Sequence, residues 1–113
     1  MKVSELEGWG LDYWVARAEG IKFERKGDIG IYELHGNDVG GYNRHEYSPS
    51  TDWARGGPII EREWITLGVD TLSDGKSWCA RVSDQHGYWT GPTPLIGAMR
   101  AFVASKLGEE VEG

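Results

Sequence analysis

Residues 65–82 constrain the fold of this chain most strongly, because their polarity alternates as it does in a β-hairpin. The alternating apolar residues are Ile65, Leu67 and Val69 before the turn and Trp78, Ala80 and Val82 after it. A period of two is typical of half-buried strands, and the Asp74-Gly75 pair between the two runs favours a tight turn. We therefore predict an antiparallel strand pair in the second half of the chain.

Helix signals lie near both ends of the chain. Thr93-Pro94 provides a hydroxyl cap followed by proline at the first helical position. The residues of that helix expected to face the sheet are Leu95, Met99, Phe102 and Val103. Near the N-terminus, Ser4 and Glu7 have the spacing of a capping box, but Gly8 and Gly10 weaken the first turn, so we expect the helix to settle only from Trp9 onward. Gly20 is a suitable helix stop.

The stretch from residue 21 to 46 is less regular. It contains two short alternating runs around Lys-Gly-Asp at 26–28, which favours a hairpin. Residues 36–46 are rich in turn formers and poor in apolar residues, so we expect an irregular, mobile loop there. Residues 83–91 are expected to form a second connecting loop.

Residues 47–63, YSPSTDWARGGPIIERE, carry the densest local signal. Ser50 or Thr51 can cap a helix, and Asp52 places a negative charge at the positive end of the helix dipole. A proline inside a helix removes a hydrogen bond at a cost of about 3 kcal/mol. We therefore expect a kink, with Pro58 as the first residue of a second helical piece.

The resulting order is helix, strands, kinked helix, hairpin and helix. This order predicts an α+β fold with a mainly antiparallel sheet and helices packed on it. A chain of 113 residues has the usual size of one domain, so we expect residues 1–113 to form a single domain. The acidic tail, residues 109–113, is expected to fray.

Charge and cysteine content argue against several function classes. The net charge is −6, which disfavours binding to duplex nucleic acid, since that binding relies on Lys and Arg neutralising phosphates. A close basic cluster exists at Lys22, Arg25 and Lys26. Cys79 is the single cysteine, so no internal disulfide can form, which suits the reducing cytoplasm. No apolar run approaches the roughly 18 residues of a membrane span, and we expect a cytoplasmic protein.

Residues with catalytic or metal-binding chemistry are present, but not in the required spacing. The histidines, His35, His45 and His86, have neither i, i+4 helical spacing nor a Cys-x-x-Cys partner. No serine occupies a Gly-x-Ser-x-Gly turn, and Glu61 and Glu63 would project to different sides of a helix. We therefore assign no catalytic residue, no metal ligand and no cofactor, and we do not expect an enzyme.

One candidate binding site is an anion or ligand site at Asp52, Arg55, Gly56 and Gly57. If a helix restarts at Pro58, the two glycines expose backbone N–H groups at a positive helix end, and this can hold an anion. The alternative is that Gly-Gly-Pro merely relieves the steric conflict of a kinked helix.

A second candidate is the adjacent pair Tyr88 and Trp89, an interface candidate in a polar, glycine-bounded stretch. These rings are either a lid folded over the edge of the core or a binding surface, since Tyr and Trp are enriched at binding hot spots. The tryptophans on apolar periods are expected to be largely buried, and these are Trp14, Trp53, Trp64 and Trp78.

Three segments, residues 11–20, 47–63 and 91–111, resemble the NinX-like family of small proteins of lambdoid phages and prophages. The resemblance covers nearly the whole chain and is weakest at 21–46. The 47–63 motif also resembles small phage domains described as α/β/α sandwiches, which implies a sheet covered by helices on both faces. The family is a domain of unknown function, so the resemblance implies a host-cell cytoplasmic setting but no reaction and no catalytic residue.

Two function classes follow. The favoured hypothesis is a non-enzymatic phage accessory protein that binds a host or phage protein, or itself, because six tryptophans and five tyrosines are many for this length. The alternative is a small enzyme or an anion- or nucleotide-binding protein centred on residues 50–58. Exposure distinguishes them, because a ligand site needs these side chains in a concave pocket.

Overall fold

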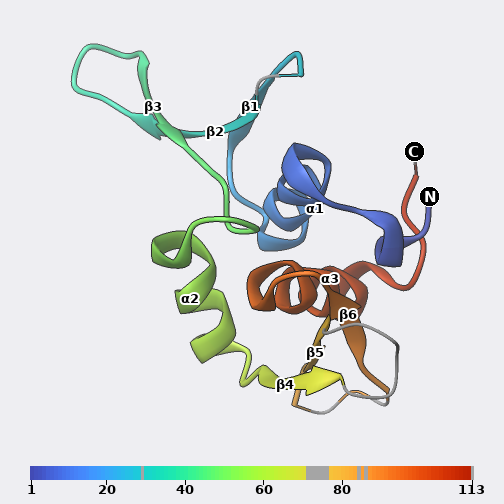
Figure 1. Cartoon of the computed structure of the whole chain (residues 1–113). Coiled ribbons are helices and arrows are strands. Elements are labelled where there is room, and N and C mark those ends of the chain that lie inside the picture. The colour runs from blue at the N-terminus through green and yellow to red at the C-terminus, as the bar shows by residue number, and fades with distance from the viewer. Residues whose placement is uncertain (29, 71–76, 84, 86, 113) are drawn as a thin grey trace.

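Two small antiparallel sheets lie at opposite ends of the molecule, with helices between them (Figure 1). The computed structural model describes residues 1–28, 30–70, 77–83, 85 and 87–112. In chain order the elements are η1 (Val3–Glu5), α1 (Gly8–Glu19), β1 (Phe23–Lys26), β2 (Gly30–Gly36), β3 (Tyr42–Glu46), α2 (Trp53–Arg62), β4 (Thr66–Asp70), β5 (Ser77–Arg81), β6 (Trp89–Gly91) and α3 (Pro94–Leu107). Within these ranges, no helix is long and apolar enough to cross a membrane.

The N-terminal helix α1 begins at Gly8, close to the Trp9 start that the two glycines favour, but the Ser4 capping box is not formed. Ser4 belongs to the short 3₁₀ turn η1, and no side chain caps α1. Val3 and Leu6 are both buried, so this first turn is held by its apolar residues and does not continue into α1. The predicted stop is confirmed, because Gly20 ends α1 in the left-handed conformation with φ 73°.

The first sheet has the order β1-β2-β3, and the predicted hairpin around residues 26–28 is confirmed. β3 lies in the stretch where we expected an irregular loop. Its five residues pair with β2 in regular antiparallel register, from Tyr32↔Glu46 to Gly36↔Tyr42. All five are exposed, so the strand has no apolar face, and an alternation in the sequence cannot reveal it. Ile31 of β2 is buried and packs the sheet against α1.

The second sheet has the order β4-β5-β6. The predicted β4–β5 pair is confirmed, whereas its turn at 74–75 lies outside the described residues. β6, in a stretch expected to be a loop, adds the third strand. A Cβ on Gly91 would lie 2.6 Å from the backbone nitrogen of Gly97, so β6 and α3 approach backbone to backbone. Glycine at this contact is therefore a packing requirement.

Helix α3 begins as predicted and forms the centre of the molecule. The Thr93 hydroxyl accepts a hydrogen bond from the Ile96 N–H at 3.1 Å, and Pro94 is the first helical residue. The predicted core residues Leu95, Met99, Phe102 and Val103 are all buried. Every residue from Gly97 to Val103 is buried, so the helix is covered on all sides.

The α+β class with antiparallel sheets and packed helices is confirmed, but the layers are in a different order from an α/β/α sandwich. The helices lie inside and the sheets outside (Figure 1). α3 contacts β5 and β6 on one side and α1 and α2 on the other, and α1 in turn contacts β2. A helix that is apolar on all of its faces, as α3 is, must pack against neighbours on every side, and a single sheet covers one side only.

The acidic tail is held against the N-terminus up to Val111, so the expectation that it frays is wrong over that part. Val111 is buried, and its N–H donates to the Met1 carbonyl at 2.9 Å, while the Met1 ammonium donates to the Val111 carbonyl at 2.7 Å. The Val3 N–H donates to the Glu109 carbonyl at 2.9 Å. The two ends of the chain therefore lie side by side (Figure 1).

Candidate functional site

The segment that the sequence singled out forms one continuous helix. α2 runs from Trp53 to Arg62 through Pro58, so the predicted restart at Pro58 is wrong. Ala54 and Pro58 are both exposed, so water can bind the Ala54 carbonyl that lacks its helical donor. Asp52 is the N-cap, and its Oδ1 accepts the Ala54 N–H at 3.0 Å. The helix is therefore capped by Asp52, and the expectation that Ser50 or Thr51 occupies the N-cap position is wrong.

The glycine pair does not form the expected anion cradle. The Gly56 N–H donates to the Asp52 carbonyl at 2.8 Å within the helix. Gly56 is buried, and an added Cβ would lie 2.5 Å from the Pro49 carbonyl oxygen and 2.6 Å from Leu95 Cδ2. Gly57 has open space at the same position. Gly56 therefore lets α2 pack tightly against Pro49 and Leu95. This role differs from the kink relief considered for the Gly-Gly-Pro run, because the helix is continuous.

Alanine at these two neighbouring positions should change stability in opposite directions. Gly56→Ala forces the Pro49 backbone or Leu95 to move, and overpacking of this kind costs about 1–3 kcal/mol. Gly57→Ala meets nothing within 4 Å and should stabilise the helix by about 0.5–1 kcal/mol. Urea denaturation of both variants measures the difference. Equal shifts in the two unfolding midpoints would contradict the packing argument.

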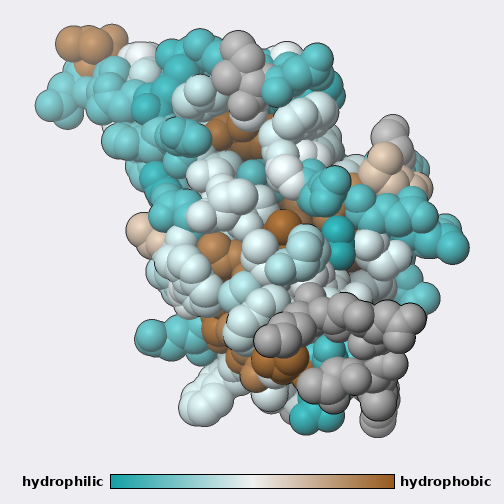
Figure 2. Space-filling view, viewed as in Figure 1, coloured by the Kyte–Doolittle hydropathy of each residue, from teal (hydrophilic) through white to brown (hydrophobic). Residues whose placement is uncertain are grey.

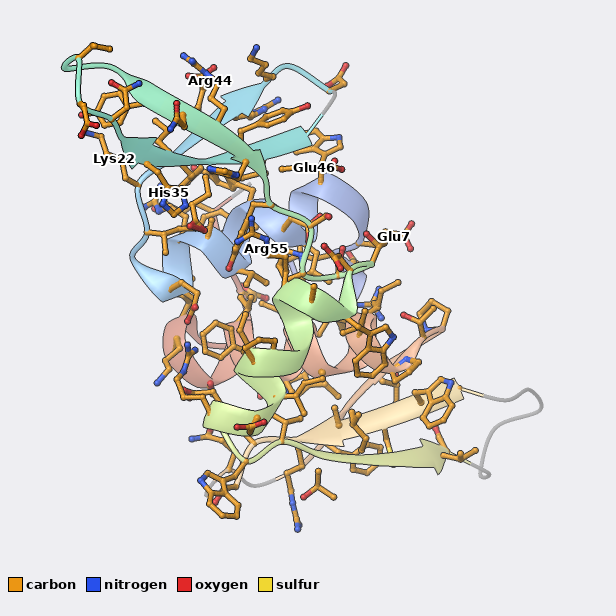
Figure 3. The ribbon with its side chains drawn as sticks, turned by 90° about the vertical axis from the view of Figure 1, so that its left-hand side faces the viewer. Glu7, Lys22, His35, Arg44, Glu46 and Arg55 are labelled. Atoms are coloured by element: carbon orange, nitrogen blue, oxygen red, sulfur yellow. The ribbon has the colours of Figure 1, made fainter. Side chains whose placement is uncertain are left out.

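Arg55 points toward the first sheet and joins a polar cluster there (Figure 3). Its Nη1 lies 3.6 Å from Glu33 Oε2, and its guanidinium lies 5.9 Å from the centre of the Tyr47 ring. Glu33 Oε1 also lies 2.6 Å from His35 Nε2, and the His45 ring packs edge-on to His35 with centroids 4.7 Å apart. The described ranges contain no group of three or more His, Cys, Asp or Glu placed to hold a metal, and His86 lies outside them.

A buried polar joint links α1 to the start of α2. Asp12 Oδ1 accepts the Ser50 N–H at 2.9 Å, and both residues are buried. Burial raises the pKa of Asp12 to about 6, although the hydrogen bonding from Ser50 partly offsets this. The hydroxyls of Ser50 and Tyr47 are buried without a hydrogen-bond partner among the described residues. Burial likewise raises the pKa of Tyr47 above its usual range.

A buried carboxyl with a raised pKa beside a serine has the composition of a catalytic pair, but the two residues border different hollows. Asp12 borders a hollow of about 180 Å³ together with Glu46 and Tyr47. Ser50 borders a different hollow, and it is 1% exposed. A substrate could not reach both groups, so the geometry supports a structural joint.

Sequence reasoning did not find this joint, although a signal was present. Asp12 lies three and four residues before Val15 and Ala16, which are both buried. An acid on the buried side of an amphipathic helix needs a partner. The partner, Ser50, is 38 residues away in the sequence, so no local pattern identifies it.

The aromatic residues are distributed differently from the prediction. Trp53, Trp64 and Trp78 are 54%, 76% and 37% exposed, so the expectation of burial is wrong for all three. Trp14 is half-buried against the core. Trp53 and Trp64 flank α2 at its two ends, whereas the apolar side chains of Ile59 and Ile60 between them pack against the core.

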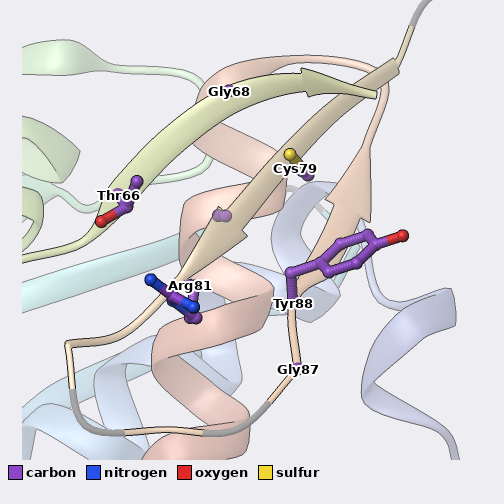
Figure 4. A pocket seen from close by; sticks show the side chains of 7 residues that line it. Thr66, Gly68, Cys79, Arg81, Gly87 and Tyr88 are labelled. Atoms are coloured by element: carbon purple, nitrogen blue, oxygen red, sulfur yellow. The ribbon is translucent and has the colours of Figure 1, made fainter. Parts of the chain in front are cut away.

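The pair Tyr88 and Trp89 is divided between the two roles considered for it. Trp89 is half-buried and packs against the core, as a lid does. Tyr88 is exposed beside a shallow hollow of about 250 Å³ on the outer face of the β4–β6 sheet (Figure 4). Cys79 also borders that hollow, and it lies on the face opposite Trp78 because adjacent strand residues point to opposite faces.

Trp89→Ala should lower the free energy of unfolding by about 2 kcal/mol, which is less than for a fully buried ring. The reason is that the indole is half-buried against the core. Tyr88→Ala is the matched control and should change stability by less than about 0.5 kcal/mol, because this ring is exposed. Thermal and urea unfolding of both variants test the assignment, and equal losses would remove the distinction between them.

Comparison with models of protein families matches residues 2–106 to the family described as Bacteriophage P22, NinX. No curated protein was found to match the chain. The match spans both sheets, the polar joint and nearly all of α3, so it covers far more than half of the 113 residues. This chain therefore belongs to the bacteriophage P22 NinX family.

Proposed function

We propose that this protein is a non-enzymatic phage accessory protein that works by binding another protein in the cytoplasm of the host cell. The observation that carries the proposal is a strip of apolar residues on one side of the molecule, of which Trp53, Trp78 and Val69 are exposed and Ile96 is half-buried. We call it the tryptophan strip, and its members are Trp53, Ile96, Trp78 and Val69.

The tryptophan strip is contributed by four elements that meet in space. Trp53 and Ile96 border the same hollow of about 210 Å³ between the starts of α2 and α3. A Cβ on Gly91 would lie 3.0 Å from Ile96 Cγ2, and Gly91 is the β6 partner of Trp78. On the other edge of β5, Val69 of β4 is the strand partner of Trp78. The strip therefore continues from α2 across α3 to the second sheet.

The surface around the strip differs from the other end of the molecule. Hydrophilic residues cover most of the β1–β3 end, whereas apolar patches emerge around the helices and beside the β4–β6 sheet (Figure 2). Exposed tryptophan is costly to hydrate and is the residue type most enriched at binding hot spots. A partner with an apolar centre and a basic rim would complement both the strip and the net charge of −6.

The cytoplasmic setting rests on the cysteine content. The single cysteine excludes an internal disulfide in these 113 residues, and proteins without disulfides suit a reducing compartment. The partner is then a host or phage protein of that compartment, or a second copy of this chain.

Affinity capture from phage-infected cells tests the proposal when it is combined with matched variants. The double variant Trp53→Ala, Trp78→Ala removes both rings of the strip. Trp64→Ala removes a more exposed tryptophan at the far end of α2, roughly 15 Å away at 1.5 Å per helical residue. We expect the double variant to lose a partner that the wild type and Trp64→Ala both capture.

Sedimentation of the purified chain tests the same surface for self-association, with the same three proteins. Recovery of identical partners and identical oligomeric states by the wild type and the double variant would overturn the proposal. Circular dichroism spectra of the variants establish that the fold is retained, which is expected because both rings are exposed.

A further inference from the structure

A second surface feature, separate from the tryptophan strip, is a cleft of about 340 Å³ beside α1. Its wall is formed by Trp9, Tyr13 and Trp14 of α1, and Arg17 and Arg25 border it from α1 and β1. Glu112 lies at its rim, next to the paired ends of the chain. This volume lies within the range of small-ligand pockets, which is about 300–1,000 Å³.

The ring wall of the cleft is fixed by packing. Tyr13 contacts Trp14 edge-on with centroids 5.0 Å apart, and it contacts Phe23 of β1 edge-on at 5.5 Å. The rings of Tyr13, Trp14 and Phe23 are half-buried and pack against the core. The wall therefore joins a helix to a strand, and it presents aromatic surface at a fixed position without an ordering cost on binding.

Two guanidinium groups are held at this wall by rings. The Arg25 guanidinium lies 4.4 Å from the centre of the Trp9 ring, and its Nε donates to the Gly27 carbonyl at 3.1 Å. The Arg17 guanidinium lies 5.5 Å from the centre of the Trp14 ring, and its Nη1 donates to the Tyr13 hydroxyl at 3.0 Å.

Neither of these arginines forms a salt bridge with a carboxylate among the described residues. They differ in this respect from Arg44, Arg55, Arg62 and Lys106, each of which forms a salt bridge with a glutamate. In a chain of net charge −6, two positive charges without acidic partners converge on one cleft. An anion can therefore accept from both without displacing a carboxylate.

The fold also explains why Arg25 is the member of the basic cluster Lys22, Arg25 and Lys26 that borders the cleft. Successive residues of β1 point to opposite faces of the sheet. Lys22 and Lys26 pack over the Tyr42 and Tyr32 rings, at 4.2 Å and 5.7 Å from their centres. Arg25 lies between them in sequence and is directed to the α1 side, over Trp9.

From these contacts we infer that the cleft binds a nucleotide, with its base stacked on the rings and guanidinium planes and its phosphate held by Arg17 and Arg25. Aromatic side chains stack on any base, and guanidinium groups bind phosphate oxygens through paired N–H donors. The Glu112 carboxylate at the rim can accept from an amino group of the base or a ribose hydroxyl. The nucleotide is either free or part of a single strand, because the same chemistry serves both.

Calorimetric titration of the full chain with adenosine 5′-monophosphate tests this inference at about 50 mM salt. Adenosine and inorganic phosphate, the two halves of this ligand, are titrated separately for comparison. We expect the monophosphate to bind more tightly than either half, and the double variant Arg17→Gln, Arg25→Gln to bind it at least tenfold more weakly. Arg81→Gln removes an exposed arginine at the other end of the molecule, and it should bind like the wild type.

A ten-nucleotide single strand distinguishes the two sources of the ligand. Tighter binding of the strand than of the monophosphate, lost in the same double variant, assigns the cleft to a strand. Equal or weaker binding of the strand assigns it to free nucleotide. The inference is overturned if the wild type binds neither compound at millimolar concentration, or if the double variant binds them as the wild type does. Both arginines are exposed, so the double variant is expected to keep its fold.

Discussion

Phe102→Ala is expected to lower the free energy of unfolding by about 3–5 kcal/mol, the largest loss from any single substitution discussed for this protein. Phe102 is completely buried and belongs to the central core cluster. It lies on α3, which contacts both the second sheet and the other two α-helices. Truncation therefore removes contacts to several elements at once and leaves a cavity in the layer that joins them.

The ring also supports two surface cations, which adds to the expected loss. The Arg62 guanidinium and the Lys106 ammonium lie 5.7 Å and 6.0 Å from its centre. Both cations also form salt bridges with Glu63. Without the ring, Arg62 and Lys106 would keep their salt bridges with Glu63 but lose the apolar surface under their side chains. The packing of α2 on α3 should therefore also become less stable.

Urea denaturation measures this loss, and Leu107→Ala provides the control. Leu107 ends the same helix and is exposed, so its truncation should cost less than about 1 kcal/mol. A Phe102→Ala midpoint close to that of Leu107→Ala would remove Phe102 from the core.

The second large effect concerns pH, because the buried Asp12 should make the protein less stable as pH rises from about 4 to about 6. The pKa of its carboxyl is about 6 in the folded protein, against a reference value of 3.8. Below the lower value the group is protonated in both states and costs nothing. Between the two values the folded chain keeps a proton that the unfolded chain releases, so the unfolding free energy falls with increasing pH.

Above about pH 6 the penalty is constant, and a difference of about two pKa units corresponds to about 3 kcal/mol. Asp12→Asn removes the charge and keeps an oxygen that can accept the Ser50 N–H. We expect this variant to be more stable than the wild type at pH 7, by up to about that amount, and to match it near pH 4.

Urea denaturation of both proteins at intervals from pH 4 to pH 8 gives the stability difference directly. Titrating groups that do not interact with Asp12 cancel in that difference, including Glu63, whose pKa is lowered by its hydrogen bond with Arg62. Glu46, whose charge helps to raise the Asp12 pKa, contributes to the difference. A difference that does not change across this range would show that Asp12 keeps a normal pKa. A difference that grows toward low pH would contradict the sign of the effect.

The two proposed binding surfaces use different residues and lie on different elements. The tryptophan strip involves the starts of α2 and α3 and the second sheet, whereas the cleft involves α1 and β1. Neither set of test substitutions touches the other surface. Loss of protein capture and loss of nucleotide binding can therefore be measured independently.

Local sequence determined those features that depend on residues a few positions apart. The cap and first turn of α3 follow from Thr93 and Pro94, because a cap needs only a hydroxyl within reach of an N–H three residues on. The β4–β5 pair follows from a period-two pattern. Gly20 ends α1 because glycine adopts the left-handed conformation without a steric cost.

The tertiary structure alone decided which faces are covered and which distant groups meet. β3 is a strand because β2 offers it backbone partners, although none of its own residues is buried. Trp53, Trp64 and Trp78 lie on apolar periods, yet neighbouring elements leave much of each ring exposed. Burial in the surrounding core raises the pKa of Asp12 against the opposing effect of the Ser50 hydrogen bond, and Arg17 and Arg25 converge only because β1 packs beside α1. Periodicity records which side of an element is apolar, but burial and charge depend on neighbours that the fold brings from elsewhere in the chain.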